Sequence, residues 1–155
     1  MAEFAQAALS EKKLEGADLI VTFESAGAQL AAIAGQALPV PYIVARKKKF
    51  SLPKEISFSV ITNFDEKKFY IYGDVMGKRI LIIDVIASGT TVKNAALALK
   101  EAGGEVIAIF VAAAKTNMTG KKYQDTLVDI NIPLVSLVQI KVVDNKVVVL
   151  SDAEK

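Results

Sequence analysis

The 155-residue sequence contains no cysteine, no histidine and no tryptophan, and the first two absences exclude whole classes of chemistry. Without cysteine the chain forms no disulfide, no thiolate metal site and no thiol nucleophile. Without histidine it has no Ser-His-Asp triad, no histidine-ligated zinc and no imidazole base. Acid–base chemistry must therefore come from Asp, Glu, Lys or Tyr side chains, or from the substrate.

Long apolar runs and a strong excess of one charge are also lacking. Hydrophobic residues make up 52% of the chain, yet no stretch reaches the roughly 20 apolar residues of a membrane-spanning helix. Glu3, Glu11, Lys12 and Lys13 interrupt the N-terminal apolar positions, so no signal peptide is predicted. A net charge of +2 is too small to indicate a nucleic-acid-binding protein. We expect one cytoplasmic domain over residues 1–155, with no nucleic-acid or membrane partner.

The stretch from Arg79 to Gly104 predicts a strand, a short loop and a helix. Ile80 to Ile83 is a continuous aliphatic run, which is typical of a strand covered on both faces in a parallel sheet, and Asp84 follows it. Further on, apolar residues recur with helical spacing at Val92, Ala95, Ala96 and Leu99 before two glycines.

The loop of this unit has the composition of a phosphate-binding loop. It consists of small and hydroxyl residues: Ala87, Ser88, Gly89, Thr90 and Thr91. A helix N-terminus carries unpaired N–H groups and a partial positive charge, so such a loop can surround a phosphate with backbone and hydroxyl donors. No GK[ST] or GxGxxG pattern is present, which argues against the common nucleoside triphosphate and dinucleotide sites.

A second unit of the same kind precedes it. Asp18 to Phe23 is predicted as a buried strand, and an apolar stripe of Leu30, Ile33, Ala34 and Ala37 predicts a helix that ends before Pro39. The residues between them are Glu24, Ser25, Ala26 and Gly27. A second anion can bind at this helix N-terminus, although the residues alone are equally compatible with an ordinary βα turn.

A basic cluster follows the third predicted strand, Tyr42 to Ala45. The cluster consists of Arg46, Lys47, Lys48 and Lys49. Four adjacent cations repel one another unless anions lie nearby, and the carboxyl ends of strands in an open α/β sheet are where ligands bind. The cluster therefore predicts an anion site, with a solvated basic turn as the alternative for any single lysine.

The remaining segments predict strands. Residues 57–61 and 68–72 alternate loosely around a polar tip at residues 63–66, which indicates a long two-stranded ribbon. Val106 to Ala113 is a further buried strand, and Lys115 follows it. The segments 134–141 and 147–150 predict a terminal hairpin.

The segment from position 80 to 91 has four hydrophobic residues, an acid, two aliphatic residues and then Ala-Ser-Gly-Thr-Thr. This pattern resembles the phosphoribosyl-pyrophosphate (PRPP) motif of the type I phosphoribosyltransferases. In that family the acids bind the ribose hydroxyls and the loop holds the 5′-phosphate. The resemblance implies that Asp84 is the catalytic residue that orients the ribose and that residues 87–91 bind the 5′-phosphate. Ile83 stands where the family usually has the first of two acids.

Other segments carry the resemblance across nearly the whole chain. Glu24 to Gly27 resembles the pyrophosphate loop of purine phosphoribosyltransferases, especially the xanthine type. The resemblance implies that Arg46, Lys47 and Lys49 also bind pyrophosphate, and that Lys115 meets an oxo group of the base, although Lys115 is equally compatible with a solvated loop position. The implied fold is a parallel sheet flanked by helices, with the ribbon closing over PRPP and with a reduced hood.

The function expected from the resemblance is transfer of phosphoribose from PRPP to a purine base, with release of pyrophosphate. A 6-oxopurine such as xanthine, hypoxanthine or guanine is expected to be preferred over adenine, Mg²⁺ is the implied cofactor, and a homodimer is the implied assembly. One alternative is a non-catalytic PRPP- or nucleotide-binding regulatory module of the same fold. The other is an unrelated α/β domain that binds a phosphorylated metabolite.

Overall fold

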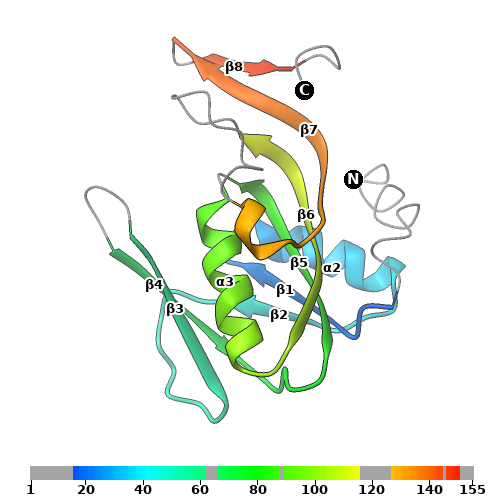
Figure 1. The fold of residues 1–155 in the computed structure, drawn as a ribbon, viewed down its shortest axis with the longest axis vertical. Helices are drawn as coiled ribbons and strands as arrows, with labels where there is room; N and C mark the ends of the chain where they lie inside the picture. Colours follow the sequence, from blue (N-terminus) through cyan, green and yellow to red (C-terminus); the bar gives the residue numbers. More distant parts are fainter. Residues whose placement is uncertain (1–15, 62–65, 88, 116–126, 145, 151–155) are drawn as a thin grey trace.

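The computed structural model describes residues 16–61, 66–87, 89–115, 127–144 and 146–150, and these residues form an α/β fold around one six-stranded sheet. Its strands are β1 (Leu19–Phe23), β2 (Tyr42–Ala45), β5 (Arg79–Ala87), β6 (Glu105–Lys115), β7 (Leu134–Val143) and β8 (Lys146–Val149). They lie in the order β2-β1-β5-β6-β7-β8 (Figure 1). All neighbouring pairs are parallel except β7 and β8. The predicted fold class is confirmed; the helix expected before residue 16 lies outside the described residues.

Two helices cover opposite faces of this sheet. Helix α2 (Gly27–Ala37) packs Ala31 and Ala34 on one face, in a cluster with Ile20 and Leu81. Helix α3 (Thr90–Glu101) packs its predicted apolar stripe on the other face. A short 3₁₀ turn, η2 (Val128–Ile130), lies beside α3, where the Lys93 ammonium contacts the Asp129 carboxylate at 2.6 Å. In the part of the chain that the structure describes, neither helix is long and apolar enough to cross a membrane.

Strand β5 is longer than its sequence predicts. The aliphatic run suggested a strand that ends at Ile83, but the strand continues through Asp84 to Ala87. Asp84 pairs with Val111 of β6 and Ala87 pairs with Ala114, so the ladder to β6 holds this segment extended. The expectation that Asp84 follows the strand and that Ala87 belongs to the loop is therefore wrong in this respect.

The predicted ribbon is present as a separate two-stranded sheet. Strands β3 (Glu55–Ile61) and β4 (Glu66–Tyr72) pair in antiparallel register and project from the main body (Figure 1). At the middle of the ribbon, Phe58 and Phe69 stack with ring centroids 5.3 Å apart, and the Phe23 ring of β1 meets both edge-on. This aromatic cluster fixes the ribbon on the carboxyl end of β1. The predicted tip falls partly outside the described residues.

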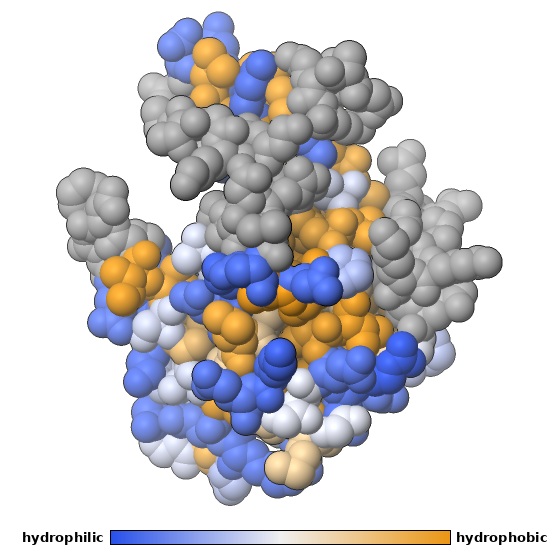
Figure 2. All heavy atoms as spheres, viewed as in Figure 1, coloured by the Kyte–Doolittle hydropathy of each residue, from blue (hydrophilic) through white to orange (hydrophobic). Residues whose placement is uncertain are grey.

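The terminal hairpin is also confirmed, as β7 and β8. Strand β8 forms one edge of the sheet, and all of its residues are exposed, including three valines. Figure 2 shows apolar surface on this hairpin, at the top of the view.

Candidate active site

An open pocket of about 310 Å³ lies at the carboxyl edge of the parallel strands, between the sheet and the ribbon. Five predicted site residues line it: Glu24, Lys47, Asp84, Thr90 and Thr91. They come from the segments after β1 and β2, from the second half of β5 and from the first turn of α3. The sheet thus brings together the carboxylates, a cation and the hydroxyl groups that the sequence placed in three separate loops.

Asp84 is the partly buried acid of this pocket. The backbone N–H of Val85 donates a hydrogen bond to its Oδ1 at 2.7 Å. Burial disfavours the ionised form and raises the pKa of Asp84 from 3.8 to about 6, although the hydrogen bond from Val85 opposes this shift. Successive strand residues point to opposite faces of the sheet, so Ile83 faces away from the pocket. It packs in the core against α2 and has no exposed surface. Asp84 is the carboxylate that β5 contributes to the pocket.

The N-terminus of α3 forms the phosphate-loop side of the pocket. Gly89 precedes the helix with φ of +97°, a conformation that favours glycine, and no side chain caps the first turn. The N–H groups of this turn are therefore available to a ligand next to the Thr90 and Thr91 hydroxyls. Ser88 lies outside the described residues, as does the side chain of Ala87.

Glu24 is the second carboxylate that lines the pocket, and two hydrogen bonds hold it. Its Oε1 accepts a hydrogen bond from the backbone N–H of Lys47 at 3.0 Å, and its own N–H donates to Ala45 at 3.0 Å. These two contacts join the loop after β1 to the segment after β2. The peptide bond between Glu24 and Ser25 is cis. Ser25, Ala26 and Gly27 continue to α2 without lining the pocket.

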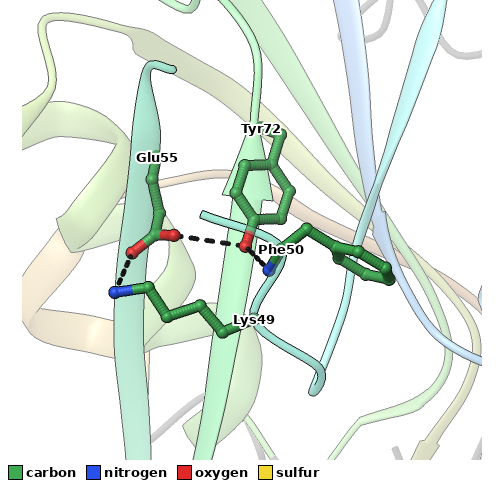
Figure 3. A network of polar contacts seen from close by, with 4 residues as sticks. All are labelled: Lys49, Phe50, Glu55 and Tyr72. Carbon is green, nitrogen blue, oxygen red and sulfur yellow. Dashed lines mark hydrogen bonds and ion pairs between the residues drawn. The ribbon is translucent and has the colours of Figure 1, made fainter. Parts of the chain in front are cut away.

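Arg46 and Lys49, among the described residues, do not line the pocket, and both contact the ribbon. Arg46 exchanges two backbone hydrogen bonds with Tyr70, at 2.8 and 2.7 Å. The Lys49 ammonium lies 3.1 Å from Glu55, which raises the pKa of Lys49, and Glu55 also accepts a hydrogen bond from the Tyr72 hydroxyl (Figure 3). The Tyr72 hydroxyl accepts a hydrogen bond from the Phe50 N–H at 2.6 Å. The basic segment thus fastens the base of the ribbon to the sheet.

Lys67 is a pocket residue that the sequence analysis missed. It lies on β4 and lines the pocket beside Val60, Ile61 and Phe69 of the ribbon. Strand alternation places Lys67 on the same ribbon face as the buried residues Phe69 and Ile71. The neighbouring Lys68 falls on the other face, where its ammonium lies 5.8 Å from the centre of the Tyr70 ring. Only the ribbon's packing distinguishes the two lysines.

Lys115 is the last residue of β6 and pairs with Ile140 of β7. It therefore sits at the carboxyl edge of the sheet, as predicted, two strands away from β1. Among the described residues it does not line the pocket between Asp84 and Lys67.

Gly27 allows α2 to approach β1 closely. A Cβ added at Gly27 would lie 2.4 Å from the Oγ1 atom of Thr22, which is too close for any side chain. Gly27→Ala is expected to lower the free energy of unfolding by about 1–3 kcal/mol through this clash. Urea denaturation would measure the change. The double variant Thr22→Ala/Gly27→Ala should recover most of the loss, whereas an equal loss in both backgrounds would contradict the clash.

Comparisons with known proteins agree with this geometry. Residues 2–147 match the model of the phosphoribosyl transferase domain family. The chain is 37% identical to a hypoxanthine/guanine phosphoribosyltransferase of Methanocella arvoryzae, over 86% of this chain and 68% of the relative. It is 31% identical to a protein of the same name from Methanothermus fervidus, over 92% of this chain and 75% of the relative.

Solved structures share the fold at lower sequence identity. An adenine phosphoribosyltransferase from Thermoanaerobacter pseudethanolicus has a TM-score of 0.74 and 24% identity, covering 89% of this chain and 79% of its own. The corresponding Rhodothermus marinus enzyme has a TM-score of 0.75 and 21% identity, covering 89% and 78%. The family match spans nearly all of the residues that build the sheet, the ribbon and the pocket, and the chain therefore belongs to the phosphoribosyltransferase family.

Proposed function

We propose that this phosphoribosyltransferase transfers phosphoribose from PRPP to a 6-oxopurine and releases pyrophosphate. The observation that carries the proposal is the pocket in which Asp84, the first turn of α3 and two lysines converge. Its sequence relatives at 31% and 37% identity are named hypoxanthine/guanine phosphoribosyltransferases, which supports the 6-oxopurine class over adenine.

The reaction forms a bond from a purine nitrogen to C1 of the ribose while the bond from C1 to the pyrophosphate oxygen breaks. The purine nitrogen loses its proton, and pyrophosphate leaves with the electron pair. Such a displacement needs little covalent help from protein groups, because positioning and charge stabilisation lower its barrier. A chain without histidine or cysteine can supply both.

Each side of the pocket has a distinct role in this proposal. Asp84 accepts hydrogen bonds from the ribose hydroxyls, and residues 87–91 hold the 5′-phosphate at the N-terminus of α3. Lys47 and Lys67 neutralise the diphosphate from opposite sides, because one comes from the sheet and the other from the ribbon. The leaving pyrophosphate lies near the loop Glu24–Gly27 and near Arg46 and Lys49.

The described residues suit Mg²⁺ that arrives with the substrate. They contain no group of three or more acidic, histidine or cysteine side chains that could hold a metal ion. Single carboxylates at Glu24 and Asp84 do line the pocket, and Mg²⁺ is commonly bound by one or two carboxylates together with substrate phosphates. Bound in this way, the ion would neutralise part of the negative charge on the diphosphate.

The ribbon excludes water from the reaction centre in this proposal. Phe69, Val60 and Ile61 contribute apolar lining to the pocket of Asp84, and the Asn94 amide of α3 donates a hydrogen bond to the Ser59 carbonyl at 2.7 Å. A ribbon that is fixed to the sheet and apolar on its inner face can cover the site and shield an oxocarbenium-like state from hydrolysis. In this proposal Lys115, the last residue of β6, meets an oxo group of the base.

Release of pyrophosphate from PRPP with Mg²⁺ tests the proposal directly. Hypoxanthine, guanine, xanthine and adenine would be offered separately to the wild-type protein. Turnover is expected with at least one 6-oxopurine at a kcat/KM at least tenfold above that with adenine. Faster turnover with adenine would overturn the base preference. Tight PRPP binding without turnover on any base would instead establish the regulatory module.

We also propose a homodimer in the cytoplasm. Symmetric dimers are the commonest assembly of soluble proteins. PRPP is a polyanion that does not cross a lipid bilayer, so an enzyme that consumes it works in the compartment that holds it. Light scattering at defined protein concentrations would give the assembly.

A further inference from the structure

Thr22 is a buried hydroxyl residue without a hydrogen-bond partner. It is the next-to-last residue of β1 and has no exposed surface. Within the described part of the chain, its Oγ1 is the one buried side-chain nitrogen or oxygen that makes no hydrogen bond. A buried polar atom without a partner lowers stability, so such an atom requires a reason.

The side chains beside Thr22 on the neighbouring strands are apolar. In the parallel register, Thr22 lies between Val44 of β2 and Ile83 of β5, and both are aliphatic. Thr22 shares its face of β1 with Ile20, which packs in the apolar cluster under α2. Valine would fill the same space at this position without leaving a hydroxyl unpaired.

The hydroxyl instead lies against the start of α2. The point where a Cβ of Gly27 would be is 2.4 Å from Thr22 Oγ1 and 3.8 Å from the carbonyl oxygen of Ile83. Gly27 is the first residue of α2, and Ala26 before it provides no side-chain cap. The Thr22 hydroxyl is therefore close to the backbone at Gly27, where the loop from Glu24 enters the helix.

We propose that Thr22 is a positioning residue for the loop Glu24–Gly27, and that its hydroxyl hydrogen-bonds the loop backbone when the loop holds the pyrophosphate group. The inference rests on the proposed function of that loop. A hydroxyl both donates and accepts, so it can pair with either a carbonyl or an N–H of the loop. A hydrogen bond made only in the ligand-bound arrangement adds to the affinity for the ligand, and the unbound protein carries the loss in stability.

Two variants separate the hydroxyl from the volume of the side chain. Thr22→Val keeps the shape and removes the hydroxyl, whereas Thr22→Ser keeps the hydroxyl. The melting temperature of Thr22→Val is expected to equal or exceed that of the wild type. Its affinity for magnesium pyrophosphate, measured by calorimetry, is expected to be about fivefold lower. The KM for PRPP should rise by a similar factor, while binding of ribose 5-phosphate stays unchanged. Thr22→Ser should bind pyrophosphate like wild type.

Three results would overturn the inference. A clearly lower melting temperature for Thr22→Val would mean that the hydroxyl has a partner in the unbound protein. Wild-type pyrophosphate affinity in Thr22→Val would mean that the hydroxyl does not act on the loop. If the wild-type protein bound neither PRPP nor pyrophosphate, the proposed function would fail as well, so the two failures are told apart by the wild-type measurement.

Discussion

Asp84→Asn is expected to raise the free energy of unfolding at pH 8 by about 3 kcal/mol. Burial raises the pKa of Asp84 from 3.8 to about 6, and each pKa unit corresponds to about 1.4 kcal/mol. Between these two pH values the folded protein keeps a proton that the unfolded chain has released. Stability therefore falls as the pH rises through this window, and it stays reduced above it. Asparagine never ionises, so the variant escapes this loss.

Urea unfolding of both proteins from pH 4 to pH 8 would check this expectation. The two stability curves should separate between about pH 4 and pH 6 and run parallel above. Asp129→Asn is a matched control, because Asp129 is exposed and its pairing with Lys93 lowers the pKa of the Asp129 carboxyl. Removing that charge should slightly lower stability at pH 8. A gain of the same size at pH 4 and at pH 8 would contradict an effect of ionisation.

The same substitution is expected to reduce kcat/KM by at least about a hundredfold, because asparagine cannot offer two acceptor oxygens to the ribose hydroxyls. An ionised carboxylate held in a partly buried position lowers the stability of the ligand-free protein. Its charge is useful when ribose and a metal-bound diphosphate fill the pocket. Opposite effects on stability and activity would thus identify Asp84 as a functional residue that the fold tolerates without needing it.

Aliphatic runs made much of the fold predictable. Strands β1, β5 and β6 each contain a run of buried apolar residues that is continuous in the sequence, and glycine or proline marks the ends of the two helices. Strand ends were less predictable. A carboxylate is not a strand signal, yet Asp84 lies within β5, because pairing with β6 decides where that strand stops.

The candidate site was predictable where it depends on single βα units. Glu24 follows β1, Asp84 lies in the second half of β5 and Thr90 begins α3, and parallel strands bring their carboxyl ends to one edge. Residues whose place depends on long-range packing were not predictable from the sequence. Lys67 lines the pocket only because the ribbon packs beside the carboxyl end of β1, and the environment of Thr22 is set by the close approach of Gly27.

Ile83 illustrates how strand alternation changes the interpretation of a motif. In the sequence, Ile83 replaces one member of an acidic pair. In the structure, its side chain faces α2 and is fully buried, whereas that of Asp84 faces the pocket. A carboxylate at position 83 would therefore lie beside Thr22 rather than beside Lys47 and Lys67. The replacement removes a charge from the core face and leaves the carboxylate in the pocket unchanged.

Lys67→Gln is expected to raise the KM for PRPP by about 10- to 100-fold. Hydrogen bonds to charged groups contribute about 1.5–3 kcal/mol, and glutamine keeps much of the side chain while removing the charge. Lys68→Gln is the matched control, because Lys68 is adjacent on β4 but lies over the Tyr70 ring on the other face. The control should stay within about twofold of wild type. Initial rates at varied PRPP and saturating purine would give both values.

Salt and the second substrate sharpen this comparison. If Lys67 binds phosphate oxygens, the KM for PRPP should depend less on ionic strength in Lys67→Gln than in wild type, because one phosphate-binding cation is lost. The KM for the purine should change little. Equal effects of the two lysine substitutions would mean that only the overall charge of the ribbon matters. Lys67 would then have no specific contact with the substrate, and the pocket would depend on Lys47 and the α3 N-terminus to hold the diphosphate and the 5′-phosphate.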